Sequence, residues 1–197
     1  MKIVWIVLAI FLVGCTTTQP HVSKYNLEPK IQKQEYVSTS CKEKSLKVGQ
    51  VFSSNSLMSQ KMNYVQGKYE ESSFTQSEWA RTPNRAISDA LVKSVRASEL
   101  FANSSTFKSR AKTDLLLETH LETFMQYFEK EAEQSSVVVV MTLNLLNTKD
   151  SKSISHATFN VEIETLSADA KGGVVALNNV LSKVLLKTNS WLDGVCK

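Results

Sequence analysis

The chain has 197 residues, of which 42% are hydrophobic and 21% are charged, with six glycines and three prolines. This composition can supply one sizeable buried core, so it argues against a largely disordered protein. The formal net charge is +4, and no run of Lys or Arg is dense enough to indicate a nucleic-acid-binding surface. We therefore expect one globular domain and no nucleic-acid partner.

The first residues have the pattern of a bacterial secretory signal. Lys2 supplies a positive charge, and residues 3–13 form an apolar run that is too short to cross a bilayer as a helix. The run ends in Gly14-Cys15, which resembles the lipobox of bacterial lipoproteins. We therefore predict that residues 1–14 are a signal peptide and that Cys15 carries covalent lipid, including an acyl chain such as palmitate. The alternative is an ordinary cleaved signal in which this cysteine is incidental.

Lipid on Cys15 would anchor the protein, because each buried acyl methylene contributes about 0.8 kcal/mol of membrane affinity. Thr16 follows the cysteine, whereas an aspartate there often signals retention in the inner membrane. We therefore expect the outer membrane as the location, with the domain facing the periplasm. The polar residues 15–23 are predicted to form a lipidated tether, and residues 24–197 the domain. No other cofactor is expected.

Two further cysteines, Cys41 and Cys196, remain in the domain. An even number of cysteines in an oxidising periplasm favours a disulfide, which we predict to stabilise the fold rather than to act in redox chemistry. The alternative is two free thiols.

The first half of the domain has weaker signals than the second. Residues 25–27 and 46–52 are interpreted as short strands, and residues 57–65 with 68–74 as a hairpin that turns near Gly67. Thr82-Pro83 then combines an N-cap residue with a proline suited to a first helical turn. Apolar residues follow at helical spacing and predict an amphipathic helix that ends near Phe101.

Alternating apolar and polar residues then predict three consecutive strands, over residues 115–127, 137–146 and 156–164, joined as an antiparallel meander. In the first strand this alternation places Met125 and Tyr127 on the buried face. Apolar residues at helical spacing over 170–185 predict a closing helix. The expected fold class is α+β: a single domain with a mostly antiparallel sheet and two main helices packed on one face.

The opposite face of the sheet should be mostly polar, with apolar exceptions that are chiefly Phe124, Phe128, Val138 and Val140. An uncovered apolar patch usually marks an interface, so we predict that these residues contact another copy of the chain or a different partner. The alternative is a third layer of structure that covers them.

The histidines offer the only constellation that resembles a metal or acid–base site. His120 and His156 could be cross-strand neighbours beside Glu118, Glu122 and Glu162. Strand alternation already accounts for them as solvated outward residues, which is the favoured interpretation. No metal-ligand spacing, nucleophile motif or phosphate-binding loop is present in the sequence. We therefore expect neither a catalytic site nor a metal site.

Several positions together resemble the ABC-type transport auxiliary lipoproteins, over residues 22–192. They are Tyr25, Leu27, Pro29, Trp79-Ala80, Pro83, Leu100-Phe101, Thr113-Asp114, Leu117, Leu121, Ala176 and Asn178-Asn179. The resemblance implies a fold related to the amino-terminal domain of TolB. The segment 42–65 and the two domain cysteines depart from the family pattern.

The resemblance also implies a function. Such lipoproteins are non-catalytic components that work with an ABC transporter and an MCE-domain protein in lipid transport between the inner and outer membranes. The competing hypothesis is a structural or regulatory lipoprotein that tethers the membrane to peptidoglycan or activates a cell-wall synthase.

Overall fold

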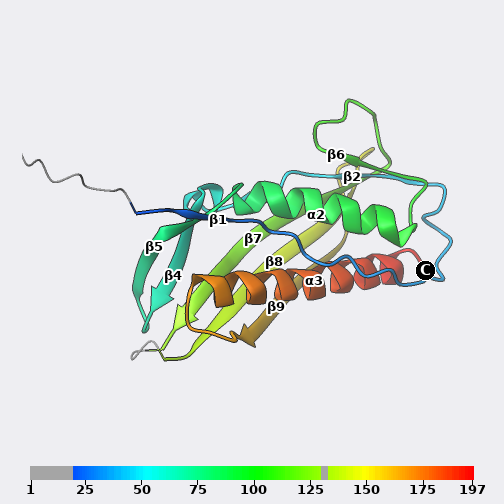
Figure 1. Ribbon diagram of the computed structural model, residues 1–197. Coiled ribbons are helices and arrows are strands. Elements are labelled where there is room, and N and C mark those ends of the chain that lie inside the picture. Colours follow the sequence, from blue (N-terminus) through cyan, green and yellow to red (C-terminus); the bar gives the residue numbers. More distant parts are fainter. Residues whose placement is uncertain (1–19, 130–132) are drawn as a thin grey trace, which may run out of the picture.

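The computed structural model describes residues 20–129 and 133–197, so the predicted lipidation site Cys15 lies outside the described residues. Helices α2 (Pro83–Ser98) and α3 (Ala170–Val195) lie side by side on one face of a mixed β-sheet (Figure 1). The predicted α+β architecture, with two helices on one sheet face, is confirmed. Among the described residues, no helix is both long and apolar enough to cross a membrane.

Strand β7 (Leu115–Phe128) is the centre of the sheet. It pairs antiparallel with β8 (Ser135–Asn147), which pairs antiparallel with β9 (Ser153–Glu164). These long ladders are the predicted meander. In β8, alternate residues from Val137 to Leu145 are at most 1% exposed, because they lie beneath the helices.

The other edge of β7 is lined by short strands that run parallel to it, one after another. They are β2 (Ser45–Val48), β3 (Phe52–Ser53) and β4 (Lys61–Gln66). Beyond them lie β6 (Asn103–Thr106) on β2, β5 (Glu70–Trp79) on β4, and β1 (Ser23–Tyr25) on β5. The predicted single strand over 46–52 is therefore two strands, and β6 was not predicted.

Local sequence explains most element boundaries. Gly67 joins β4 and β5 with φ +59°, which glycine adopts without steric cost, so the predicted hairpin is confirmed. Its first arm starts later than predicted, because residues 55–58 form the short 3-10 helix η1 (Asn55–Met58). Helix α2 starts at Pro83 as expected, but the Thr82 hydroxyl accepts no capping bond from a backbone N–H and instead donates to Asn84 Oδ1 at 2.7 Å. The helix ends at Ser98, three residues before the predicted Phe101, because the next residue, Glu99, adopts the left-handed conformation with φ 53°.

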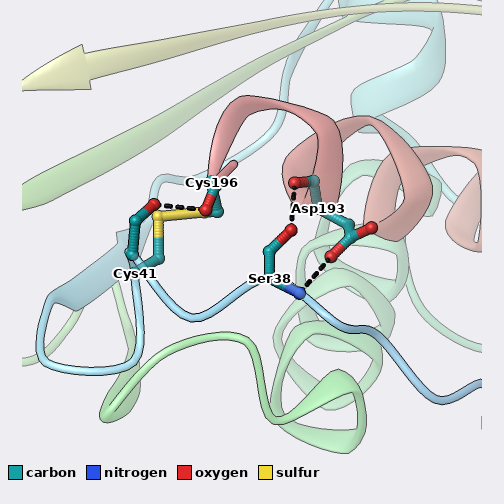
Figure 2. The surroundings of a disulfide bond; sticks show 5 residues. Ser38, Cys41, Asp193 and Cys196 are labelled. Atoms are coloured by element: carbon teal, nitrogen blue, oxygen red, sulfur yellow. Dashed lines mark hydrogen bonds between the residues drawn. A yellow bond between two sulfur atoms is a disulfide. The ribbon is translucent and has the colours of Figure 1, made fainter.

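Helix α3 continues ten residues beyond its predicted end, and a disulfide holds its last turn. Cys41 and Cys196 are joined, with their Cα atoms 5.3 Å apart (Figure 2). Next to the disulfide, the Ser38 backbone N–H donates to Asp193 Oδ1 at 3.2 Å and the Ser38 hydroxyl donates to the Asp193 carbonyl at 2.9 Å. The linker between β1 and β2 is thereby fixed to the end of α3, whose apolar stripe closes the core.

Candidate functional site

The candidate site is the side of strands β7, β8 and β9 that faces away from α2 and α3, which we call the open face. Its composition depends on a β-bulge in β7. Leu121 pairs with Met141 and Thr123 with Val140, so Glu122 is one extra residue in the ladder. The Glu122 carboxylate accepts a hydrogen bond from the Thr142 hydroxyl at 2.6 Å. Beyond the bulge, the alternation of β7 is reversed.

This reversal corrects the predicted interface. Phe124 and Phe128 were expected on the open face, but they are 3% and 8% exposed on the helix-covered side. The Phe124 ring lies 5.9 Å from that of Trp79, and the Phe128 ring lies 5.2 Å from that of Tyr64. Both phenylalanines therefore belong to the packed side of the sheet.

The bulge has the opposite effect on Met125 and Tyr127. They were expected on the buried face, but they follow the register of the open face, where Met125 pairs with Val138; Met125 is nevertheless buried, with 8% of its surface exposed. Val138 and Val140 are half-buried there, as predicted from their alternation. We call Met125, Val138 and Val140 the valine patch. Because the face carries no helix, Val138 and Val140 remain available for contact, as does the half-buried pair Leu116 and Leu146 nearer the other end of the face.

The two ends of the open face carry opposite charges. At the carboxyl end of β7, Glu71, Glu162 and Glu164 lie around Tyr127. Partial burial, together with the negative charges of Glu71 and Glu162, raises the pKa of the Tyr127 hydroxyl above its usual value. Acidic side chains therefore predominate at this end, although Lys68 lines the same hollow.

At the other end of the open face, Lys47, Lys112 and Lys149 line a hollow of about 610 Å³. Asp114 also lines it, but its carboxylate accepts hydrogen bonds from the Ser45 N–H at 2.8 Å and the Ser45 hydroxyl at 2.7 Å. These bonds, and to a lesser extent the positive charge of Lys149, hold the pKa of Asp114 below its ordinary range. The carboxylate thus stays ionised and bound, while three lysines leave the hollow positive.

The histidines do not come together. His120 is opposite Thr142 and His156 is opposite Asn144, so β8 lies between them and they sit in different rows of the ladder. In residues 20–129 and 133–197, no group of three or more His, Cys, Asp or Glu side chains could hold a metal ion. The favoured interpretation of both histidines as outward residues fits their exposed positions.

On the helix-covered side, the reversed alternation places Gln126 against the start of α3. Its amide, 2% exposed, donates to Ser135 Oγ at 2.9 Å and to the Asp169 carbonyl at 3.1 Å. The Asp169 carboxylate caps the helix by accepting a hydrogen bond from the Gly172 N–H at 2.6 Å. This bond, together with a hydrogen bond from the Ser167 hydroxyl, lowers the pKa of Asp169. A Cβ atom on Gly173 would lie 2.0 Å from Gln126 Oε1, so glycine is required for this contact. The pair Gly172-Gly173 therefore serves the entry into helix α3.

Sequence reasoning missed the open-face roles of Met125, Tyr127 and the three lysines. Glu122-Thr123 places two polar residues in succession at the bulge, but Glu118-Thr119-His120 does the same in a regular part of β7, so this pattern alone does not locate the bulge. The lysines carry no sequence signal either, because they come from β2, from the segment before β7 and from the β8–β9 turn.

Comparison with known proteins places this arrangement in a family. The sequence profile of the family described as "ABC-type transport auxiliary lipoprotein component" matches residues 25–187. No curated protein sequence matches the chain.

Solved structures agree on the fold. A crystal structure of protein XCC0632 from Xanthomonas campestris superposes with a TM-score of 0.79 at 15% identity, covering 88% of this chain and 96% of that one. A second crystal structure, of an uncharacterized protein, gives a TM-score of 0.66 at 14% identity and covers 87% of this chain and 99% of that one. The family profile spans nearly the whole domain, including all the strands of the open face. The chain therefore belongs to the ABC-type transport auxiliary lipoprotein family, whose members are auxiliary components associated with the cell envelope.

Proposed function

We propose that this protein is an outer-membrane lipoprotein, anchored through Cys15, that docks an ABC transporter and MCE-domain protein system for lipid transport between the two membranes. In this role the protein binds partners and catalyses no reaction. The family assignment supports the auxiliary role, and the lipobox supports the anchor. The observation that carries the docking role is the open face, where the valine patch lies between a basic end and an acidic end.

The geometry of the valine patch suits a protein partner. Val138 and Val140 project from the same side of β8, and the buried Met125 lies opposite Val138 on β7. Apolar residues at the centre of a surface and charged residues at its rim are the usual anatomy of a protein interface. The opposite charges at the two ends would fix the orientation of a partner with complementary charges.

The tether is short enough to keep the domain close to a membrane. Eight peptide steps separate Cys15 from Ser23, where β1 begins. An extended chain advances about 3.3 Å per residue, so the tether spans at most about 26 Å. A lipid on Cys15 would therefore hold the domain within roughly one domain diameter of the bilayer.

Metabolic labelling tests the anchor. A fatty-acid analogue should label the wild-type protein, and Cys15→Ala should lose the label and remain uncleaved or be released from the membrane. Label that persists on Cys15→Ala would refute the anchor.

Co-purification tests the partner. The full lipidated protein should be solubilised from membranes after cross-linking and probed for the MCE-domain protein and the transporter of the same organism. Their recovery at stoichiometric levels supports the proposal. Recovery of a cell-wall synthase in their place would favour the structural or regulatory role.

A further inference from the structure

Strand β9 forms an edge of the sheet that is unlike the other edges. Among the described strands β9 pairs only with β8, so one side of its 12 residues has no strand partner. The other edges are the three-residue β1 and the four-residue β6. A long unpaired edge exposes a row of backbone N–H and C=O groups that can pair with another strand.

The centre of β9 has none of the features that usually block edge pairing. Residues 155–161 contain no Lys, Arg, Asp, Glu or Pro. A bulge occurs only before them, at Ile154, where Leu145 pairs with Ser155 and Leu146 pairs with Ser153. The stretch from Ser155 onward therefore forms a regular ladder whose free edge is open to a partner.

The side chains of this stretch are self-complementary in size. On the helix-covered side, small residues come first and large apolar residues follow, in the order Ser155, Ala157, Phe159, Val161 and Ile163. An antiparallel copy centred on Phe159 places Ser155 opposite Ile163 and Ala157 opposite Val161. The large side chains are only partly buried in the single chain, so such pairing would remove more of their surface from water.

The open-face side chains of β9 are complementary in the same register. His156 falls opposite Glu162, and Thr158 falls opposite Asn160, so each cross-strand pair joins a donor to an acceptor. This register also pairs the whole regular stretch from Ser155 to Ile163 with itself. The sizes of the side chains, the polar pairs and the length of the paired stretch therefore all favour the same two-fold arrangement.

We propose that β9 pairs antiparallel with β9 of a second copy of this chain, centred on Phe159, so that two sheets become one continuous sheet. The pairing leaves the valine patch uncovered on β7 and β8. It also brings Ile163 of one copy next to Ser155 of the other, whose hydroxyl accepts from Trp191 Nε1 at 3.2 Å. The interface is isologous, as a two-fold dimer requires.

Disulfide trapping tests both the contact and its register. In the full lipidated protein in membranes, Thr158→Cys with Asn160→Cys places cysteines opposite each other across the two-fold axis. Glu162→Cys with Glu164→Cys is the matched control, because it has the same strand, face and spacing, but its opposing residues are His156 and Ile154. Mild oxidation should give a cross-linked dimer with the first variant, at least tenfold more than with the control. No dimer, or equal dimer in both, would overturn the proposal.

The association state gives an independent reading. Thr158→Lys with Asn160→Lys would place like charges opposite each other, whereas Thr158→Gln with Asn160→Gln would keep the polar pairing. Sedimentation of the detergent-solubilised protein should show a dimer for the wild type and the Gln variant and a monomer for the Lys variant. A monomeric wild type, or a Lys variant that remains dimeric, would contradict the pairing.

Discussion

The two faces of strand β8 show how the same residue type acquires different roles. Four consecutive valines, residues 137–140, alternate between the faces. Val137 and Val139 are fully buried beneath the helices, whereas Val138 and Val140 are half-buried on the open face. Their chemistry is identical, so the difference lies in what covers them. The comparison separates residues that stabilise the fold from residues that are free to bind.

The largest expected difference concerns Phe124, which the bulge turns into the core. Phe124→Ala should lower the free energy of unfolding by about 4 kcal/mol, because it leaves a cavity beside Trp79. Val138→Ala, on the open face, should cost below about 1 kcal/mol. Denaturant unfolding measures both values. Equal costs would show that the bulge does not divide the faces as described.

The bulge also limits what could be predicted from the sequence. Alternation predicted the meander, the buried face of β8 and the outward position of Val138, because one side of each long strand is covered by helices. It failed after Glu122, since one extra residue reverses the side-chain direction without altering composition. The disulfide partners could be predicted because two cysteines remained after Cys15. The parallel strands beside β7 could not, because their order depends on distant pairings.

The second-largest effect concerns the covered side, where the Cys41–Cys196 disulfide fixes α3. Cys41→Ser with Cys196→Ser should lower the free energy of unfolding by about 3 kcal/mol, because the disulfide restricts a long loop in the unfolded chain. Unfolding of the wild type with and without reductant provides the check. A loss below about 0.5 kcal/mol would mean that the hydrogen bonds from Ser38 to Asp193 and from the Ser40 hydroxyl to the Cys196 carbonyl hold the helix end without the disulfide.

Helix α3 contains one glycine that is packed against the sheet, Gly173, and one that is exposed, Gly194. Gly173→Ala should destabilise the protein by about 2 kcal/mol, because its Cβ would overlap Gln126 on β7. Gly194→Ala, which meets no atom within 4 Å, should be neutral or stabilising by up to about 1 kcal/mol. Thermal unfolding of both variants measures the contrast. Equal shifts would rule out close contact between α3 and β7 at this point.

The smallest effect concerns the cap of α3. Asp169→Ala should cost about 1 kcal/mol at neutral pH, because the Gly172 N–H loses its acceptor. The folded-state pKa of Asp169 lies below its unfolded value, so the contribution is complete above pH ~4 and disappears as the pH falls through the folded pKa. The difference between wild type and variant should therefore shrink in acid. A difference that is constant down to pH ~2 would contradict the cap.

The central claim, that the open face docks the transport partner, is tested by charge placed on the valine patch. The double variant Val138→Glu with Val140→Glu should remain folded. In the cross-linking assay it should bind the MCE-domain partner at least tenfold more weakly than the wild type, because two carboxylates would be buried against an apolar surface. The matched control is Val37→Glu with Val175→Glu, two exposed valines outside the open face. We expect full binding by the control and lost binding by the patch variant. Unchanged binding by a folded patch variant would contradict the account.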